Sequence, residues 1–148
     1  MGPNRVKKDA AEVFRDCVAT RLRMASRVIT KVYDDALRPL GLTVSQMSLL
    51  AVAQDRGLLR QSEVGAELQL DDSTLSRNLE RMRAHGWLEE VPADDARVHS
   101  YRLTPAGVAL LDKAVPAWRG AQGEAQRLLG DAGVRALRRF ANEQGFAG

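Results

Sequence analysis

The stretch from Asp71 to Gly86 combines side chains that can recognise another molecule with a helical pattern. Leu75, Leu79 and Met82 recur at i, i+4 and i+7, which predicts one buried stripe on an amphipathic helix. The opposite face carries short hydroxyls and forked hydrogen-bond donors, namely Ser73, Thr74, Arg77 and Arg81. Such a face could contact base edges in a DNA major groove, and a solvated surface helix is the alternative.

Other reactive side chains do not form a pattern that predicts catalysis. His85 and His99 are the two histidines, and no cysteine or carboxylate cluster at ligand spacing accompanies them. The chain also lacks a Ser/His/Asp arrangement, a glycine-rich phosphate loop and a pattern of paired carboxylates. The sequence therefore predicts a protein that is not an enzyme and that needs no metal or cofactor.

The charge of the chain is unevenly distributed. The 148 residues carry a formal net charge of +3, but residues 61–103 hold 5 Lys/Arg against 9 Asp/Glu, whereas residues 1–60 hold 11 against 6. The segment that contains the candidate recognition helix is therefore net acidic. If this segment binds DNA, individual arginines must supply the contacts.

Helical periodicity predicts one long helix from about residue 9 to residue 40, ended by Pro39 and Gly41. Roughly 30 residues at about 1.5 Å each would span more than one side of a small domain. Part of this helix should therefore pack on a partner subunit. Cys17 falls on its apolar stripe, which predicts a buried thiol.

The next elements form a helix-turn-helix. Thr43 is expected to cap a helix, with Gln46 in the capping-box position three residues later. A short helix over about residues 61–68 then precedes Asp71–Gly86. The residues expected on the buried side of the first of these helices are Val44, Met47, Leu50 and Ala51.

A hairpin and a C-terminal helical region complete the chain. Strands are predicted over residues 87–91 and 98–103, with Tyr101 and Leu103 on one face and Ser100 and Arg102 on the other. Thr104-Pro105 predicts the start of a helix, because a hydroxyl cap and a first-turn proline both favour one. Pro116 is expected to kink or break that helix.

Cysteine content and hydropathy indicate the compartment. Cys17 is the single cysteine, so no intrachain disulfide can form, and no apolar run approaches the roughly 20 residues that span a bilayer. The basic N-terminal residues have no apolar segment behind them, which argues against a secretory signal. The expectation is a cytoplasmic protein without membrane contact.

The block from Leu68 through Gly107 resembles the MarR family of winged helix-turn-helix transcription regulators. Asp95-Ala96-Arg97 is similar to the D-x-R signature of the family's wing, and Leu103-Thr104-Pro105-Ala106-Gly107 to its LT-x-x-G helix start. The resemblance covers nearly all of residues 1–148. It implies a mainly α fold with a small β-wing, in which residues 43–103 form a winged DNA-binding lobe and residues 9–40 and 104–146 a helical dimerisation lobe.

The resemblance also implies a function. We expect a homodimer that binds double-stranded DNA at a pseudo-palindromic operator and represses transcription until a small, possibly aromatic, effector releases it. Two alternatives remain open. The acidic segment 61–103 would suit an interaction module that kept the winged fold without binding DNA, and Cys17 would suit a redox-switched repressor.

Side chains on the recognition stretch and the wing are the candidates for DNA contact. Arg97 could enter a narrow minor groove, where the Asp95 carboxylate would orient its guanidinium. Glu89-Glu90 and Ala96 stand where the family often has arginine, and Arg60 where a hydroxyl cap is usual. The full candidate set is Arg60, Asp72, Ser73, Thr74, Ser76, Arg77, Arg81, Asp95 and Arg97.

The resemblance further implies an effector pocket between the dimer helices and the DNA-binding lobe. Each candidate lining residue has ordinary core packing as its alternative. Cys17 lies near the position of a reactive cysteine in a peroxide-sensing branch of the family, although Val44 replaces one of the tyrosines expected there. The candidate lining residues are Met24, Arg27, Val28, Tyr33, Met47 and Leu50.

Overall fold

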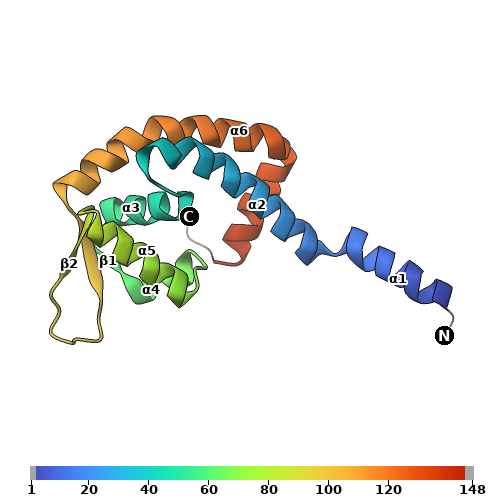
Figure 1. Cartoon of the computed structure of the whole chain (residues 1–148), viewed down its shortest axis with the longest axis horizontal. Helices are drawn as coiled ribbons and strands as arrows, with labels where there is room; N and C mark the ends of the chain where they lie inside the picture. Colours follow the sequence, from blue (N-terminus) through green and yellow to red (C-terminus); the bar gives the residue numbers. More distant parts are fainter. Residues whose placement is uncertain (1–2, 146–148) are drawn as a thin grey trace.

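Helices dominate the computed structural model, which describes residues 3–145 (Figure 1). In chain order the elements are α1 (Pro3–Asp16), α2 (Val18–Leu37), the 3-10 helix η1 (Arg38–Leu40), α3 (Val44–Arg56), β1 (Leu59–Arg60), α4 (Gln61–Glu67), α5 (Asp72–Ala84), β2 (Leu88–Val91), β3 (Ser100–Leu103) and α6 (Pro105–Glu143). The predicted class, mainly α with a small β-wing, is confirmed. Residue 146, the predicted end of the helical lobe, lies outside the described residues.

None of the helices within residues 3–145 is by itself long and apolar enough to cross a membrane. The segments Val18–Leu40 and Val44–Arg56, bent by 75° where they meet, pass the same test of length and composition as a pair. The second of them, α3, lies in the core of the winged lobe.

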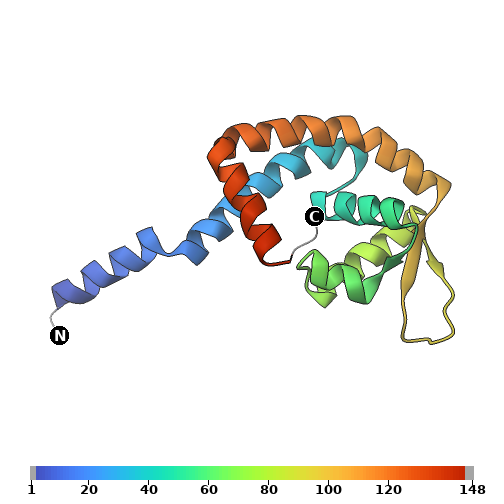
Figure 2. The ribbon, with the colours of Figure 1, turned by 180° about the vertical axis from the view of Figure 1, so that it is seen from behind.

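The single long N-terminal helix predicted from the sequence is wrong, because two helices, α1 and α2, occupy this region. Cys17 separates them with an extended backbone (φ −63°, ψ 112°). The Arg21 side chain bridges the break, since its Nε donates to the Arg15 carbonyl at 2.7 Å. No glycine or proline lies near Cys17, so the sequence carries no signal for the break. Together α1 and the first part of α2 project from the body as an arm (Figures 1 and 2).

Helix α3 begins with the predicted capping box. The Gln46 N–H donates to Thr43 Oγ1 at 3.3 Å, and the Thr43 N–H donates to Gln46 Oε1 at 3.1 Å. Met47 and Leu50 are buried as expected, but Ala51 is exposed and Val44 is half-buried. Because α3 contacts α2, α6, β1 and β3, its buried surface is wider than one stripe and also includes Leu49 and Ala53.

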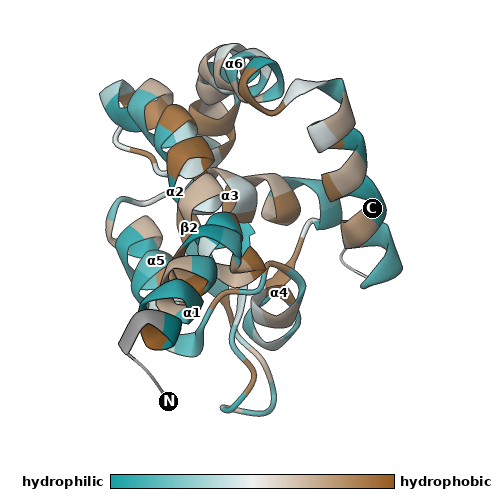
Figure 3. Cartoon of the chain, turned by 90° about the vertical axis from the view of Figure 1, so that its right-hand side faces the viewer, coloured by the Kyte–Doolittle hydropathy of each residue, from teal (hydrophilic) through white to brown (hydrophobic). Residues whose placement is uncertain are grey.

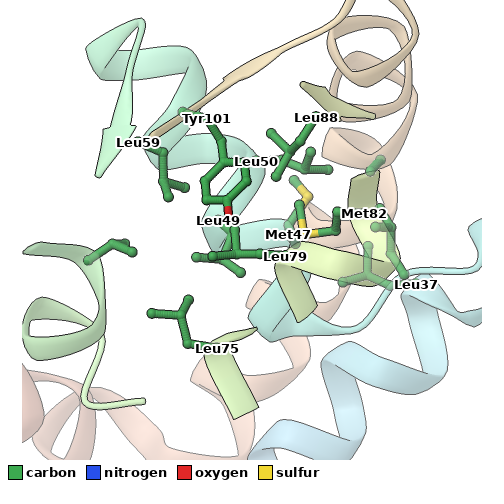
Figure 4. Packing of buried hydrophobic residues seen from close by; sticks show 14 residues of the cluster. Leu37, Met47, Leu49, Leu50, Leu59, Leu75, Leu79, Met82, Leu88 and Tyr101 are labelled. Carbon is green, nitrogen blue, oxygen red and sulfur yellow. The ribbon is translucent and has the colours of Figure 1, made fainter. Parts of the chain in front are cut away.

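The core of the winged lobe fixes which side of α5 faces outward. Leu75, Leu79 and Met82 are fully buried, as the sequence predicts. They pack in one cluster with Leu49 and Leu50 of α3 (Figure 4). Each such side chain contributes about 1.5–3 kcal/mol by leaving water. Rotating α5 would expose all three, so the opposite face is held toward solvent.

The wing is part of a three-stranded antiparallel sheet with strand order β1-β3-β2. The sequence did not predict β1, because two residues are too short to show a period. Pairing of Arg60 with Ser100 covers the second edge of β3. Ser100 and Tyr101 are therefore both buried, which corrects the alternation expected for this strand.

Helix α6 begins at the predicted cap, where the Gly107 N–H donates to Thr104 Oγ1 at 3.1 Å. The helix continues through Pro116, so the break expected there is wrong. Proline's fixed φ is itself helical, and only its missing N–H and ring clash oppose the helix. The backbone becomes non-helical at Gly130 (φ 68°, ψ 164°), a conformation that glycine adopts without strain. Beyond it α6 turns back beneath its own first part (Figure 1).

Candidate nucleic-acid interface

Asp71 organises the first turn of α5. Its Oδ1 accepts from the Thr74 N–H at 2.9 Å and from Ser73 Oγ at 2.7 Å, and its Oδ2 accepts from Thr74 Oγ1 at 2.6 Å. These bonds, those from Thr74 first, hold the pKa of the Asp71 carboxyl far below its usual range. The helix ends as predicted, with Gly86 at φ 73°. Asp71 was not among the candidate site residues, although its place before a hydroxyl pair was the available signal.

The candidates on α5 are brought together on its outer side. Asp72, Ser73, Ser76, Arg77 and Arg81 are exposed, and Thr74 is half-buried. Among residues 3–145, neither Arg77 nor Arg81 has a carboxylate within ion-pair distance. Their guanidinium donors therefore face solvent without an internal partner.

Ion pairs inside the lobe occupy most of the carboxylates of the acidic segment. Five of them have an arginine partner: Glu63 with Arg60 (3.2 Å), Glu67 with Arg56 (2.5 Å), Glu89 with Arg102 (2.6 Å), Glu90 with Arg83 (3.5 Å) and Asp95 with Arg97 (3.1 Å). Asp71 is engaged in capping α5. Two of these partners, Arg56 and Arg60, lie outside residues 61–103 and offset part of the net negative charge of that segment. The five paired carboxylates do not form ion pairs with Arg77 or Arg81.

The wing tip has the geometry expected from the D-x-R spacing. Arg97 donates from Nε to Asp95 Oδ1 and from Nη2 to Asp95 Oδ2, both at 3.1 Å. The Arg97 backbone N–H also donates to Asp95 Oδ1, and these bonds lower the pKa of the Asp95 carboxyl. The Arg97 side chain is 90% exposed, so it is oriented but open to a partner.

Hydrogen bonds through Gln61 join α4 to α5 and to β3, and another joins His99 to Glu90 within the wing. Gln61 Nε2 donates to Ser76 Oγ at 3.0 Å, and the Tyr101 hydroxyl donates to Gln61 Oε1 at 3.4 Å. Glu90 accepts from His99 Nδ1 at 2.8 Å, and this contact first, then Arg83, lowers the pKa of the Glu90 carboxyl. Sequence reasoning missed Gln61, because only the fold places it beside α5. Arg60 makes no cap hydrogen bond at the start of α4.

The six candidate effector residues do not line one cavity in the described chain. Met47 and Leu50 are buried in the core of the winged lobe, while Met24 and Val28 are exposed on α2. Arg27 lines a separate open depression on α2. A pocket that joins all six between the dimer helices and the DNA-binding lobe, as the resemblance implies, stays a prediction.

Tyr33 is the one effector candidate that lines a cavity between α2 and α6. Its hydroxyl donates to Gln122 Oε1, and burial raises the pKa of the Tyr33 phenol. The cavity has a volume of about 240 Å³ and is also bordered by Ile29, Leu129 and Leu137.

Cys17 is half-buried within the described chain, and its burial in an assembly stays a prediction. Its neighbours on the apolar stripe, Phe14 and Val18, are exposed on the projecting arm. Hydrogen bonds from Thr20, first from its side chain and then from its backbone, lower the pKa of the Cys17 thiol.

A helix-turn-helix followed by a three-stranded wing defines a winged helix-turn-helix protein, and comparisons with known proteins agree. A sequence profile of the MarR family matches residues 40–97. The transcriptional regulator MosR of M. tuberculosis, solved in complex with DNA, is 42% identical, with 86% of this chain and 92% of that chain covered and a TM-score of 0.75.

Two further relatives are less similar in sequence. The multiple antibiotic resistance protein MarR of Salmonella typhimurium (strain LT2) is 26% identical over 109 residues, which are 72% of this chain and 76% of the relative. The HTH-type transcriptional regulator YwoH of Bacillus subtilis (strain 168) is 29% identical over 57% of this chain, and the match spans 61% of YwoH. The chain belongs to the MarR family of transcriptional regulators.

Proposed function

We propose that this MarR-family chain is a homodimeric repressor that binds double-stranded DNA at a pseudo-palindromic operator. The observation that carries the proposal is the outer face of α5. Arg77 and Arg81 lie there without carboxylate partners among the described residues, beside a wing whose Arg97 is oriented and exposed. The DNA complex of the 42% identical MosR supports the same use of the fold.

In the proposed complex, α5 enters the major groove. Arg77 lies one turn beyond Ser73, so its forked donors can reach a guanine edge or a phosphate. Arg97 at the wing tip enters the adjacent minor groove, whose negative potential is strongest where A·T pairs narrow it. Asp95 offsets part of the Arg97 charge and in return holds the guanidinium in one orientation.

The projecting arm is the proposed dimer surface. Phe14 is 73% exposed and Val18 71% exposed, and Leu22 and Val28 continue the apolar surface along α2. Figure 3 shows hydrophobic stretches on α2 next to hydrophilic ones. Large exposed apolar surfaces mark interaction sites. A second copy of the chain would cover this surface and would place two α5 helices for the two halves of an operator.

An effector would act by shifting the population of dimers. The cavity beside Tyr33 lies between α2 and α6, which pack against each other and both contact α3 of the winged lobe. One dimer state has its α5 helices at the separation that fits DNA, and the other does not. A small molecule that binds the second state more tightly lowers DNA affinity by the difference between its binding free energies for the two states. The phenol of Tyr33 and its apolar neighbours suit an aromatic ligand.

Titration of a fluorescent duplex from the DNA upstream of the gene, at several salt concentrations, tests the proposal. We expect tight binding at low salt, a steep loss of affinity as salt rises, and two protomers per duplex. Binding that is absent at low salt for every upstream fragment, or that is insensitive to salt, would refute DNA binding and favour the interaction module.

A further inference from the structure

Hydrogen bonds in the first turn of α5 fix where two hydroxyl protons point. Ser73 and Thr74 each donate the hydroxyl proton to the Asp71 carboxylate, at 2.7 Å and 2.6 Å. An ionised carboxylate can accept hydrogen bonds but cannot donate them. The direction of both bonds is therefore set by chemistry and does not depend on a choice of rotamer.

The consequence concerns what these hydroxyls can offer to DNA. A hydroxyl has one proton and two lone pairs, so Ser73 and Thr74 retain only acceptor capacity toward another molecule. Phosphate oxygens are also acceptors and cannot pair with them. In the major groove the amino groups of adenine (N6) and cytosine (N4) are the donors.

We propose that Asp71 is a specificity-determining positioning residue, which makes Ser73 and Thr74 obligate acceptors and so directs the start of α5 to adenine or cytosine. This inference rests on the proposed function, because it assumes that α5 enters the major groove. The strongly lowered pKa of Asp71 supports it, since the carboxylate stays ionised across the physiological range. Ser76 differs, because its partner is the neutral amide of Gln61, which has both a donor and an acceptor end.

The substitution Asp71→Asn separates this role from capping. Asparagine is as good a helix cap as aspartate, so its Oδ1 can still accept from the Thr74 N–H. Its Nδ2 is a donor, however, and would donate to Thr74 Oγ1. The Thr74 proton would then turn outward, and Thr74 would become a donor toward DNA.

Selection from a library of random double-stranded DNA tests the inference, with native protein, Asp71→Asn and Glu80→Gln compared at one salt concentration. Glu80 is an exposed carboxylate of α5 that makes no hydrogen bond to a hydroxyl within residues 3–145, so Glu80→Gln is the charge-matched control. The native protein and Glu80→Gln should prefer adenine or cytosine at the same operator positions. In Asp71→Asn this preference should fall roughly two- to tenfold, the effect of one hydrogen bond.

A second variant keeps the test decisive if Asp71→Asn does not fold. Thr74→Val removes one hydroxyl but leaves the Asp71 carboxylate and the Thr74-position N–H in place, so it should lose the same preference. Operator preferences that are unchanged in Asp71→Asn and in Thr74→Val would overturn the inference and leave the proposed function standing. Failure of the native protein to select any sequence would remove the proposed function, and this inference with it.

Discussion

Gly107 provides a sharp test of how the wing is joined to α6. A Cβ atom at this position would lie 2.1 Å from the Trp87 carbonyl oxygen, 3.0 Å from its carbon and 2.9 Å from Leu103 Cδ2. The same oxygen accepts the Thr104 N–H at 3.1 Å, so the backbone cannot withdraw without losing that bond. Overpacking usually costs 1–3 kcal/mol, and a clash with backbone belongs at the upper end. Gly107→Ala should therefore lower the free energy of unfolding by about 3 kcal/mol.

Gly120→Ala is the matched control on the same helix. Nothing lies within 4 Å of the Cβ it would add, and alanine in a helix interior is favoured over glycine by about 0.5–1 kcal/mol. Urea unfolding, followed by circular dichroism at fixed protein concentration, should thus shift in opposite directions for the two variants. A Gly107→Ala protein that unfolds at the native urea midpoint would refute the packing argument.

Three further predictions concern the wing, the arm and the thiol. Arg97→Ala should weaken binding to duplexes with A·T-rich flanks more than to G·C-rich ones in fluorescence anisotropy, and equal losses would contradict minor-groove entry. Phe14→Glu should halve the mass measured by light scattering, whereas Val98→Glu, at another exposed apolar position on the wing, should leave it unchanged. Because the pKa of Cys17 is lowered, its thiolate should form, and react with iodoacetamide, at lower pH than the thiolate of free cysteine. Thr20→Val should raise the pH midpoint of this reaction. A midpoint that the substitution does not change would exclude Thr20 as the cause.

The helix-turn-helix was predictable because its signals are local. In α3 and α5 a capping residue marks the start, a repeated apolar spacing marks the buried face, and a glycine follows the end. Each of these signals depends on neighbours within a few residues. The Asp95–Arg97 contact was predictable for the same reason. The break at Cys17 has no such local signal, since it is one change of ψ with no glycine or proline nearby.

Contacts between distant segments explain most of the other differences. β1 exists because Leu59 and Arg60 pair with a strand about 40 residues later. Gln61 and Ser76 become neighbours through the packing of α4 on α5, and five carboxylates find arginine partners that the net charge does not reveal. The effector candidates lie apart in the described chain, because α3 is buried on more than one side while Met24 and Val28 are exposed on α2.

Duplex DNA titration of the native protein, Arg77→Ala and Arg119→Ala over a range of salt concentrations tests the central claim most directly. Arg119 is an exposed arginine of α6, so its removal changes net charge equally without altering the outer face of α5. We predict that Arg77→Ala weakens binding and reduces the slope of log K against log salt by about one unit, while Arg119→Ala keeps the native slope. Identical slopes for all three proteins, or binding by none of them, would contradict the claim that α5 contacts DNA.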